Sequence, residues 1–147
     1  MAQLRRAERR YRLGTRDYGR LAAFRYALRA FLRFSEDAAA SVGLTGQHYQ
    51  AMLVVRACPE PRRLAIADLA RQLLIKHNSA VELVDRLVEL DLLARQTARD
   101  DRRKVELTLT PRGRNLLAKL AVVHRAELRR MGPQLERFFA SLSAEAE

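Results

Sequence analysis

The stretch Asp100–Gly113, DDRRKVELTLTPRG, decides the fold. Its middle alternates apolar and polar residues over Val105–Leu109, the spacing of two that sends neighbouring side chains to opposite faces of a β-strand. Thr110-Pro111 then predicts a helix start, because a hydroxyl can cap the first turn and proline fits the first helical position. The charged residues at the front of the stretch predict an exposed turn. The sequence here therefore predicts a turn, a strand and the beginning of a helix.

A second strand precedes this stretch. Residues Leu93–Thr97 nearly alternate in polarity, and Ala98–Arg103 are all charged apart from Ala98. We expect a two-stranded hairpin with a charged tip. Before it, two apolar faces at helical spacing predict two short helices: Ile66, Leu69, Ala70 and Leu73, then Ala80, Leu83, Val84 and Leu87. Joined by a turn near Leu74–Lys76, they resemble a helix-turn-helix.

Longer helices flank this centre. Apolar residues three and four apart predict an amphipathic helix over residues 17–41, and Gly43 suits the left-handed position after its end. Thr45 can cap a following helix, about Thr45–Ala57, which two prolines at Cys58-Pro59-Glu60-Pro61 bring to an end. Downstream we expect a helix from Pro111 to about residue 130, an interruption at Gly132-Pro133, and a last helix.

Composition narrows the function. Lys and Arg number 28 against 17 Asp and Glu, giving a net charge of +11, so polyanions such as nucleic acid are the first partners to consider. One cysteine excludes an internal disulfide and a four-thiolate metal site, and no nucleophile, phosphate-loop or metalloprotease motif is present. No apolar stretch has the length of a membrane span. We expect a cytoplasmic, non-enzymatic protein without metal or cofactor.

The motifs resemble those of the MarR family of winged-helix transcription regulators over about residues 17–147. The resemblance rests on Leu44-Thr45, Asp68-Leu69-Ala70, Leu83-Val84-Asp85-Arg86-Leu87 and, above all, Asp100–Gly113. It implies a winged helix-turn-helix at about residues 45–110 and dimerisation helices at about 17–41 and 111–147. The arginine-rich composition of residues 1–16 predicts a basic N-terminal arm. The expected fold class is mainly α with a small β-hairpin wing.

The resemblance implies a homodimer built from the terminal helices. The sequence supports this through an apolar stripe that is longer than a small core needs: Leu128, Met131, Leu135, Phe138, Phe139 and Leu142. The alternative is that the stripe closes the monomer's own core. The arginines of the N-terminal arm either follow phosphates or keep a tail soluble.

The second helix of the pair is the expected DNA-reading element. Its apolar face leaves five side chains outward at the front: Lys76, His77, Asn78, Ser79 and Glu82. Such positions reach base edges in the major groove, where Asn can bond adenine and Glu can accept from cytosine. Alternatively, Asn78 or Ser79 merely caps the helix and Glu82 pairs with Arg86. Many family members carry Ser at Lys76, Thr-Arg at Val81-Glu82 and Gly at Asp91, so family contacts do not transfer to those positions.

The hairpin tip supplies the second expected DNA contact. Its candidates are Arg99, Asp101, Arg102 and Arg103, because a cationic tip suits the narrow minor groove. The resemblance implies that Arg103 inserts and that Asp101 holds it through a charge-assisted bond. The alternative is a solvated hairpin whose Asp and Arg residues pair with each other.

The main hypothesis is a dimeric repressor that binds a pseudo-palindromic double-stranded operator and is released by a small effector. The family binds effectors, often aromatic acids, near the junction of dimerisation helices and winged module, and the candidate walls here are Phe24, Tyr26, Leu28, Phe31 and Tyr49, with Arg25 or Arg29 for a carboxylate. Core packing is the alternative role. A non-specific architectural nucleic-acid-binding protein is the competing function. Cys58 is expected to be a passive thiol rather than a redox sensor.

Overall fold

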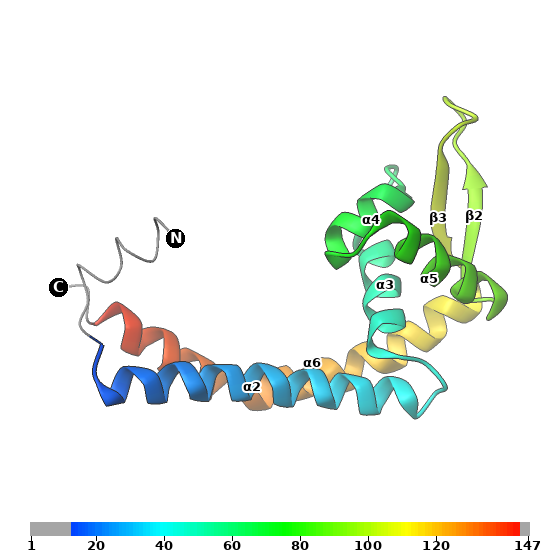
Figure 1. The fold of residues 1–147 in the computed structure, drawn as a ribbon. Helices are drawn as coiled ribbons and strands as arrows, with labels where there is room; N and C mark the ends of the chain where they lie inside the picture. The colour runs from blue at the N-terminus through cyan, green and yellow to red at the C-terminus, as the bar shows by residue number, and fades with distance from the viewer. Residues whose placement is uncertain (1–12, 145–147) are drawn as a thin grey trace, which may run out of the picture. The chain divides into compact units, whose positions relative to one another are not determined.

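The structure, a computed structural model, describes residues 13–144. Within them the chain forms five helices and one three-stranded sheet (Figure 1). In chain order these are α2 (Thr15–Ala40), α3 (Gly46–Ala57), β1 (Leu64–Ala65), α4 (Ile66–Leu73), α5 (His77–Glu89), β2 (Leu93–Thr97), β3 (Val105–Leu109) and α6 (Pro111–Ser143). The predicted fold class is confirmed. Of the basic arm expected over residues 1–16, residues 1–12 lie outside the described part of the chain, and residues 15 and 16 belong to α2.

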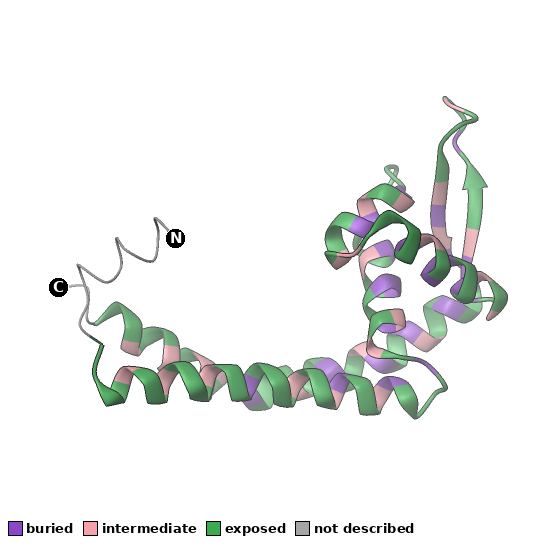
Figure 2. Cartoon of the chain, viewed as in Figure 1, coloured by how far each residue is buried: buried purple, intermediate pink, exposed green. Residues whose placement is uncertain are grey.

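The described chain divides into two compact units. The winged unit comprises residues 34–126, and the helical unit comprises residues 13–33 and 127–144. Helices α2 and α6 each contribute one part to either unit. Buried residues are dense in the winged unit, whereas most residues of the helical unit are exposed (Figure 2).

The winged unit has a core between the helices and the sheet. Met52 of α3, Leu69 of α4 and Leu87 of α5 are fully buried there, together with Leu93 and Leu107 of the strands. The sheet order is β1-β3-β2, with all pairs antiparallel, and Leu64 faces Leu107 across the ladder. Strand β1 has two residues, which is too short for alternation to be seen in sequence, so the sequence predicted only the hairpin.

The helix-turn-helix has the predicted boundaries. Helix α4 ends at Leu73, its C-cap Leu74 adopts a left-handed conformation with φ 55°, and α5 begins at His77. A positive φ also occurs at Gly43, where the sequence predicts it, and at Asp91, with values of 77° and 57°. Asp91 lies in the turn after α5, and Asp tolerates this region better than most residues.

Thr110 caps the start of α6 and hydrogen-bonds it to the turn before β2. The Thr110 hydroxyl donates to the Asp91 carbonyl at 2.6 Å and accepts the Gly113 N–H at 2.9 Å, while the Thr110 N–H donates to the Leu92 carbonyl at 3.1 Å. Gly113 is buried directly against that Leu92 carbonyl, with no room for a Cβ atom. The Thr-Pro-Arg-Gly sequence is therefore a clamp between the wing and the helix that follows it.

The expected interruption at Gly132-Pro133 is wrong, because α6 continues through both residues. A proline inside a helix gives up the one hydrogen bond that its missing N–H would donate and crowds the preceding turn. Here the remaining bonds on either side maintain the helix to Ser143. The last helix predicted from the apolar residues after Pro133 is therefore the end of α6.

The helical unit is held by a small apolar contact between α2 and α6. The rings of Phe24 and Phe138 are stacked with centroids 4.6 Å apart, and Phe139 meets Phe24 edge-on at 5.8 Å. Ala27 and Met131 are buried. The predicted apolar stripe on α6 is thus divided, since Met131 and Phe138 pack inside the unit while Leu128, Phe139 and Leu142 are exposed.

Candidate nucleic-acid interface

Helix α5 exposes its predicted DNA-reading side chains. Its buried face consists of Ala80, Leu83, Val84 and Leu87, which fix the rotation of the helix on the core. The five predicted contact residues at its front are all exposed: Lys76, His77, Asn78, Ser79 and Glu82. Amphipathic spacing alone therefore placed these side chains correctly on the open face.

The capping alternative for Asn78 and Ser79 does not describe this helix. The N-cap is Lys76, whose side chain makes no capping hydrogen bond, so Asn78 and Ser79 lie inside the first turn. Their exposed side chains leave the front of α5 with polar groups and with backbone N–H groups, which together suit an anion or a base edge.

Arg86 has a different partner from the one considered in the sequence. Its guanidinium lies 3.3 Å from the carboxylate of Glu89, and both side chains are well exposed. Such an exposed pair contributes little to stability, about 0–1 kcal/mol. Arg86 thus remains available to phosphate on the side of α5 away from the core.

The hairpin is a regular antiparallel ladder with a tight charged tip. Strand β2 pairs with β3 from Leu93↔Leu109 to Thr97↔Val105, and beyond the ladder the Ala98 N–H donates to the Lys104 carbonyl at 3.0 Å. The tip stands beyond α4 and α5 in Figure 1. The three predicted cationic contacts there, Arg99, Arg102 and Arg103, are exposed.

Asp101 organises the tip, but not in the way expected. Its carboxylate accepts a hydrogen bond from the backbone N–H of Arg103 at 2.9 Å, and its carbonyl accepts the Lys104 N–H at 3.1 Å. No ion pair between Asp101 and the Arg103 guanidinium is formed within the described residues. Asp101 therefore shapes the backbone turn from which Arg103 projects and leaves its guanidinium exposed.

A link between the wing and the helix-turn-helix was not predicted. The guanidinium of Arg95 on β2 forms an ion pair with Asp85 on α5. No spacing rule connects a strand residue with a helix residue ten positions earlier, so the pair could not be read from the sequence. The pair joins the two elements that carry the candidate DNA contacts.

His48 completes a capping box at the start of α3. The Thr45 hydroxyl accepts the His48 N–H at 3.2 Å, and Nδ1 of His48 accepts the Thr45 N–H at 3.1 Å. Burial lowers the pKa of His48, the charge of Arg86 lowers it further, and Glu36 opposes them. The neutral ring is the form that can accept at Nδ1.

This capping box predicts a pH dependence of stability. Because the folded pKa of His48 is below the ordinary 6.5, the unfolded chain binds more protons, and stability falls as the pH drops through 6.5. His48→Gln should flatten this decline, since glutamine fills the same capping position without titrating. Urea unfolding between pH 8 and pH 5 measures the slope. Thr45→Ala is the control, because it removes the hydroxyl cap at every pH but should keep the slope; an unchanged slope in His48→Gln would contradict the assignment.

The winged unit also buries a histidine. His124 is 3% exposed; its Nδ1 lies 2.7 Å from the Leu120 carbonyl and its Nε2 lies 2.9 Å from the Ser35 hydroxyl. The ring stacks on Tyr49 with centroids 3.9 Å apart. Burial raises the pKa of Tyr49. Both rings therefore belong to the core that joins α3 to α6.

The predicted effector residues lie in different units. Phe24 stacks on Phe138 in the helical unit, where both line a pocket of about 220 Å³. Tyr26 and Arg29 are exposed on α2 of the same unit, and 72% of Tyr26 is accessible. Tyr49 is buried in the winged unit. Their joint role in binding an effector stays a prediction.

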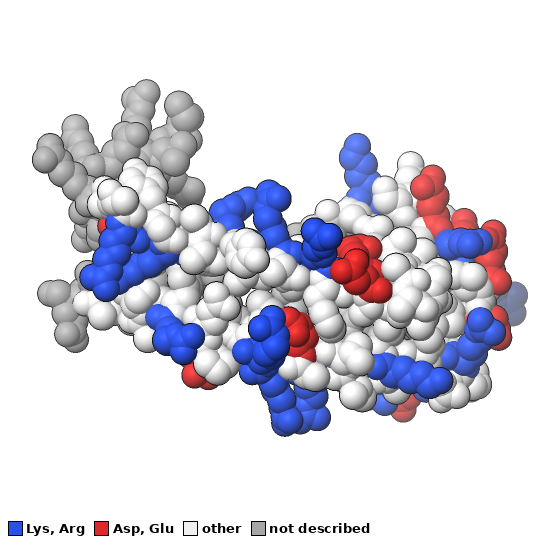
Figure 3. All heavy atoms as spheres, turned by 90° about the horizontal axis from the view of Figure 1, so that it is seen from below, with Lys and Arg blue, Asp and Glu red and all other residues white. Residues whose placement is uncertain are grey.

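Charge distribution fits an anionic partner. Lys and Arg side chains are spread over the face drawn in Figure 3, with fewer acidic side chains among them. Among the residues that the structure describes, no group of His, Cys, Asp and Glu side chains could hold a metal ion. Within the same residues, no helix has the length and apolar character needed to span a membrane.

Comparisons with known proteins agree with this geometry. Residues 42–104 match the model of the MarR family. The chain is similar to AbsC, a MarR family transcriptional regulator from Streptomyces coelicolor, with 21% identity, 93% of each chain covered and a TM-score of 0.74. It is similar to MepR, a transcription regulator of the Staphylococcus aureus multidrug efflux pump MepA, with 16% identity over 84% of this chain and 93% of that one and a TM-score of 0.71.

A third similar structure contains nucleic acid. It is the transcriptional repressor CouR bound to a 23-mer DNA duplex, with 25% identity, 85% of this chain and 90% of that chain covered, and a TM-score of 0.66. A search of curated proteins gave no match. Residues 42–104 thus match the model of the MarR family, and the chain shares its winged-helix fold with solved transcription regulators.

Proposed function

We propose that the protein is a homodimeric repressor that binds a pseudo-palindromic operator and is released by a small effector. The observation that carries the proposal is the exposed polar front of α5 beside a hairpin whose tip projects cationic side chains. A recognition helix and a wing read adjacent grooves, and a two-fold dimer presents two such modules to half-sites about one helical turn apart. The winged module is proposed to extend over residues 45–110.

Helix α5 is proposed to enter the major groove. Asn78 can make two hydrogen bonds to an adenine edge, and Lys76 and His77 can donate to guanine or phosphate. The Ser79 hydroxyl can donate to or accept from a base edge, and the Glu82 carboxylate can accept a hydrogen bond from cytosine. Arg86, about one turn beyond Glu82, is proposed to meet the DNA backbone. This arrangement has no Arg at position 82, so its operator will differ from those that family members read with one.

The dimer is proposed to form through the helical unit. Exposed large apolar side chains of this unit include Leu21, Leu28, Leu32, Leu128, Phe139 and Leu142. Exposed apolar area of this extent is unusual for a monomer and is normally covered by a partner. A second copy of the chain is the partner that the family resemblance implies. The dimerisation helices are proposed to lie within residues 17–41 and 111–147.

The effector is proposed to be a small aromatic acid. The apolar wall supplied by Phe24 and its neighbour Phe138 supports this choice, as does the proximity of Arg20 and Arg137, which line the same pocket and can meet a carboxylate. Release requires that the effector bind more tightly to a dimer whose α5 spacing mismatches the half-sites.

One experiment tests the proposal as a whole. Duplexes bound by the protein are selected from a random pool, and the affinity for the selected site is compared with that for random duplex at fixed salt. A preference of about 10³-fold or more is expected for a specific regulator. Sedimentation of the complex should give two chains for each selected site. Equal affinity for both duplexes would instead indicate a non-specific architectural protein.

Asn78→Ala should relax the preference at one base pair in each half-site. The expected cost is about 1–3 kcal/mol for a lost bidentate contact. The measurement is binding to the selected site and to single-base variants of it. Asn115→Ala, an exposed asparagine on α6, is the matched control and should leave the preference unchanged. Equal weakening on every variant would mean that Asn78 meets only the backbone.

A further inference from the structure

The winged unit contains a second pocket, separate from the predicted DNA-contacting side chains. It has a volume of about 710 Å³ and lies between the end of α3, the segment before β1, strands β2 and β3, and the first turn of α6. Ligand pockets usually have volumes of about 300–1,000 Å³. The hollow is thus large enough for a small metabolite.

The pocket is lined by an excess of cationic side chains. Four arginines line it: Arg56, Arg62, Arg63 and Arg114. Glu60 is the only acidic residue in the lining. Within the described chain, none of these arginines forms an ion pair with a carboxylate. Like charges gathered around a concave surface raise the local potential and attract an anion.

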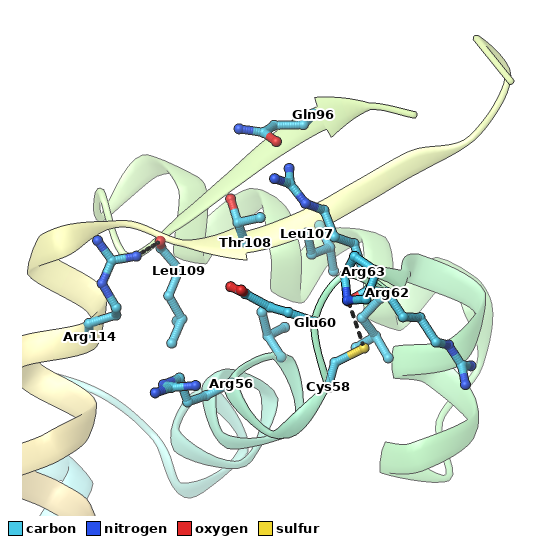
Figure 4. A pocket seen from close by; sticks show the side chains of 13 residues that line it. Arg56, Cys58, Glu60, Arg62, Arg63, Gln96, Leu107, Thr108, Leu109 and Arg114 are labelled. Atoms are coloured by element: carbon cyan, nitrogen blue, oxygen red, sulfur yellow. Dashed lines mark hydrogen bonds between the residues drawn. The ribbon is translucent and has the colours of Figure 1, made fainter. Parts of the chain in front are cut away.

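One guanidinium is already oriented. Nη1 of Arg114 donates to the Leu109 carbonyl at 3.1 Å, which holds this side chain against the wall and leaves its other N–H groups free to bind. In Figure 4 the side chains of Arg56 and Arg114 lie on either side of Glu60, and the side chain of Arg63 extends towards Gln96 at the other end of the pocket. Guanidinium groups therefore lie towards both ends, which suits an elongated molecule with more than one anionic group.

We propose that this pocket binds a small organic polyanion that carries two or more carboxylate or phosphate groups. Guanidinium groups make bidentate hydrogen bonds with both kinds of oxyanion, so the lining suits either kind. A single carboxylate would leave most of the cationic lining unpaired. The pocket differs in place and in charge from the apolar one beside Phe24.

Binding has a consequence for the wing. Residues of β2 and β3, among them Gln96 and Thr108, form part of the wall, so an occupant contacts the strands that carry the Arg103 tip. An occupant that fits one position of these strands better than another will alter DNA affinity. This consequence rests on the proposed function, whereas binding of the anion does not.

The test is calorimetric titration of the full-length protein without DNA at constant ionic strength. Citrate and fructose 1,6-bisphosphate are the two polyanion probes, and benzoate is the monoanion. We expect saturable binding of at least one polyanion and much weaker binding of benzoate. Comparison of citrate with the bisphosphate tells whether the pocket prefers carboxylate or phosphate. No saturable binding of either probe at millimolar concentration would overturn the proposal.

Matched variants locate the binding. Arg114→Met and Arg63→Met should each weaken polyanion binding about tenfold, the loss expected for one charge-assisted hydrogen bond. Arg112→Met removes the same charge from a side chain that does not line the pocket and should have little effect. Glu60→Gln should tighten binding, because it removes the one acidic side chain of the lining. Glu106→Gln should not, because Glu106, like Arg112, does not line the pocket. Equal effects of Arg112→Met and Arg114→Met would show only a general charge effect and would overturn the proposal.

A DNA titration separates this inference from the proposed function. If citrate binds but no duplex is preferred, the anion site stands and the operator-binding proposal fails. If Arg63→Met and Arg114→Met weaken DNA binding although no probe binds the wild-type protein, the pocket's arginines contact DNA phosphate and the anion site is wrong. Polyanion binding together with a changed operator affinity supports both.

Discussion

Gly113→Ala should lower the free energy of unfolding by about 3 kcal/mol, as expected for severe overpacking at a fixed site. A Cβ atom at this position would overlap the carbonyl oxygen of Leu92 and lie 3.0 Å from its carbonyl carbon. The obstacle is backbone rather than a flexible side chain. Leu92 cannot move away easily, because it is buried and its carbonyl accepts the Thr110 N–H at 3.1 Å.

The matched control lies in the same helix. Gly132→Ala places its Cβ atom where no heavy atom lies within 4 Å, so helix propensity alone should act. The expected result is a gain of about 0.5–1 kcal/mol. Urea unfolding at one protein concentration measures both variants. Gly113→Ala within about 0.5 kcal/mol of the wild type, the usual range for a harmless substitution, would show that the clamp at the start of α6 is loose.

The importance of Gly113 illustrates what sequence can and cannot supply. Thr110-Pro111 predicted the helix start correctly, because capping and proline geometry depend only on neighbouring residues. In isolation, a glycine three residues into a helix is only a weak helix former. The approach of the Leu92 backbone, which makes the glycine necessary, comes from a chain segment 21 residues earlier.

The same distinction explains the errors and omissions in the fold. Helices α4 and α5 were predicted because their apolar faces follow the helical period. Pro133 was expected to interrupt α6, since the local rule for proline is unfavourable, but the helix continues on both sides of it. Strand β1 forms because Leu64 pairs with Leu107, which is far away in the sequence. Two residues are too few to show the alternating pattern from which a strand is predicted.

The candidate site divides similarly. Exposure of Asn78 and its neighbours followed from the buried face of α5, which periodicity defines. The partners of the charged residues did not follow. At a separation of two residues, Asp101 can bond either the Arg103 guanidinium or its backbone N–H, and only the turn geometry selects the backbone. The pair Arg95 and Asp85 required the packing of strand on helix.

Arg103→Ala should weaken operator binding by about 1–3 kcal/mol and reduce the salt slope by about one unit. The reason is the proposed wing contact. Replacing Arg103 by alanine removes the favourable interaction of its guanidinium with the negative potential of the minor groove. The side chain is exposed and makes no described ion pair, so folding should not change. Binding is measured on the selected operator and on random duplex at two salt concentrations.

Arg129→Ala is the control for net charge. Arg129 is an exposed residue of the helical unit and lies outside the proposed DNA surface. Its removal lowers the net charge by the same amount and should change operator affinity only slightly. Equal weakening by the two variants would contradict a specific role of Arg103 and would indicate that the whole charge of the protein determines affinity.

Asp101 gives the sharpest test, because its charge and its hydrogen bond act in opposite directions. Asp101→Ala removes a negative charge, which by itself strengthens binding to DNA, but it also removes the acceptor of the Arg103 N–H. If the turn directs Arg103 into the groove, the loss of order is expected to dominate and operator binding should weaken. Asp101→Asn removes the same charge and keeps an oxygen acceptor for the turn.

The two Asp101 variants should therefore differ in sign on the operator. Asp101→Asn is expected to bind as tightly as the wild type or more tightly, while Asp101→Ala binds more weakly. On random duplex, where the position of Arg103 carries less of the affinity, both variants should bind slightly more tightly through charge alone. A wing that is only a solvated charge run makes the two variants indistinguishable, both tighter than the wild type on either duplex. That outcome would show that the turn formed by Asp101 has no role in DNA recognition.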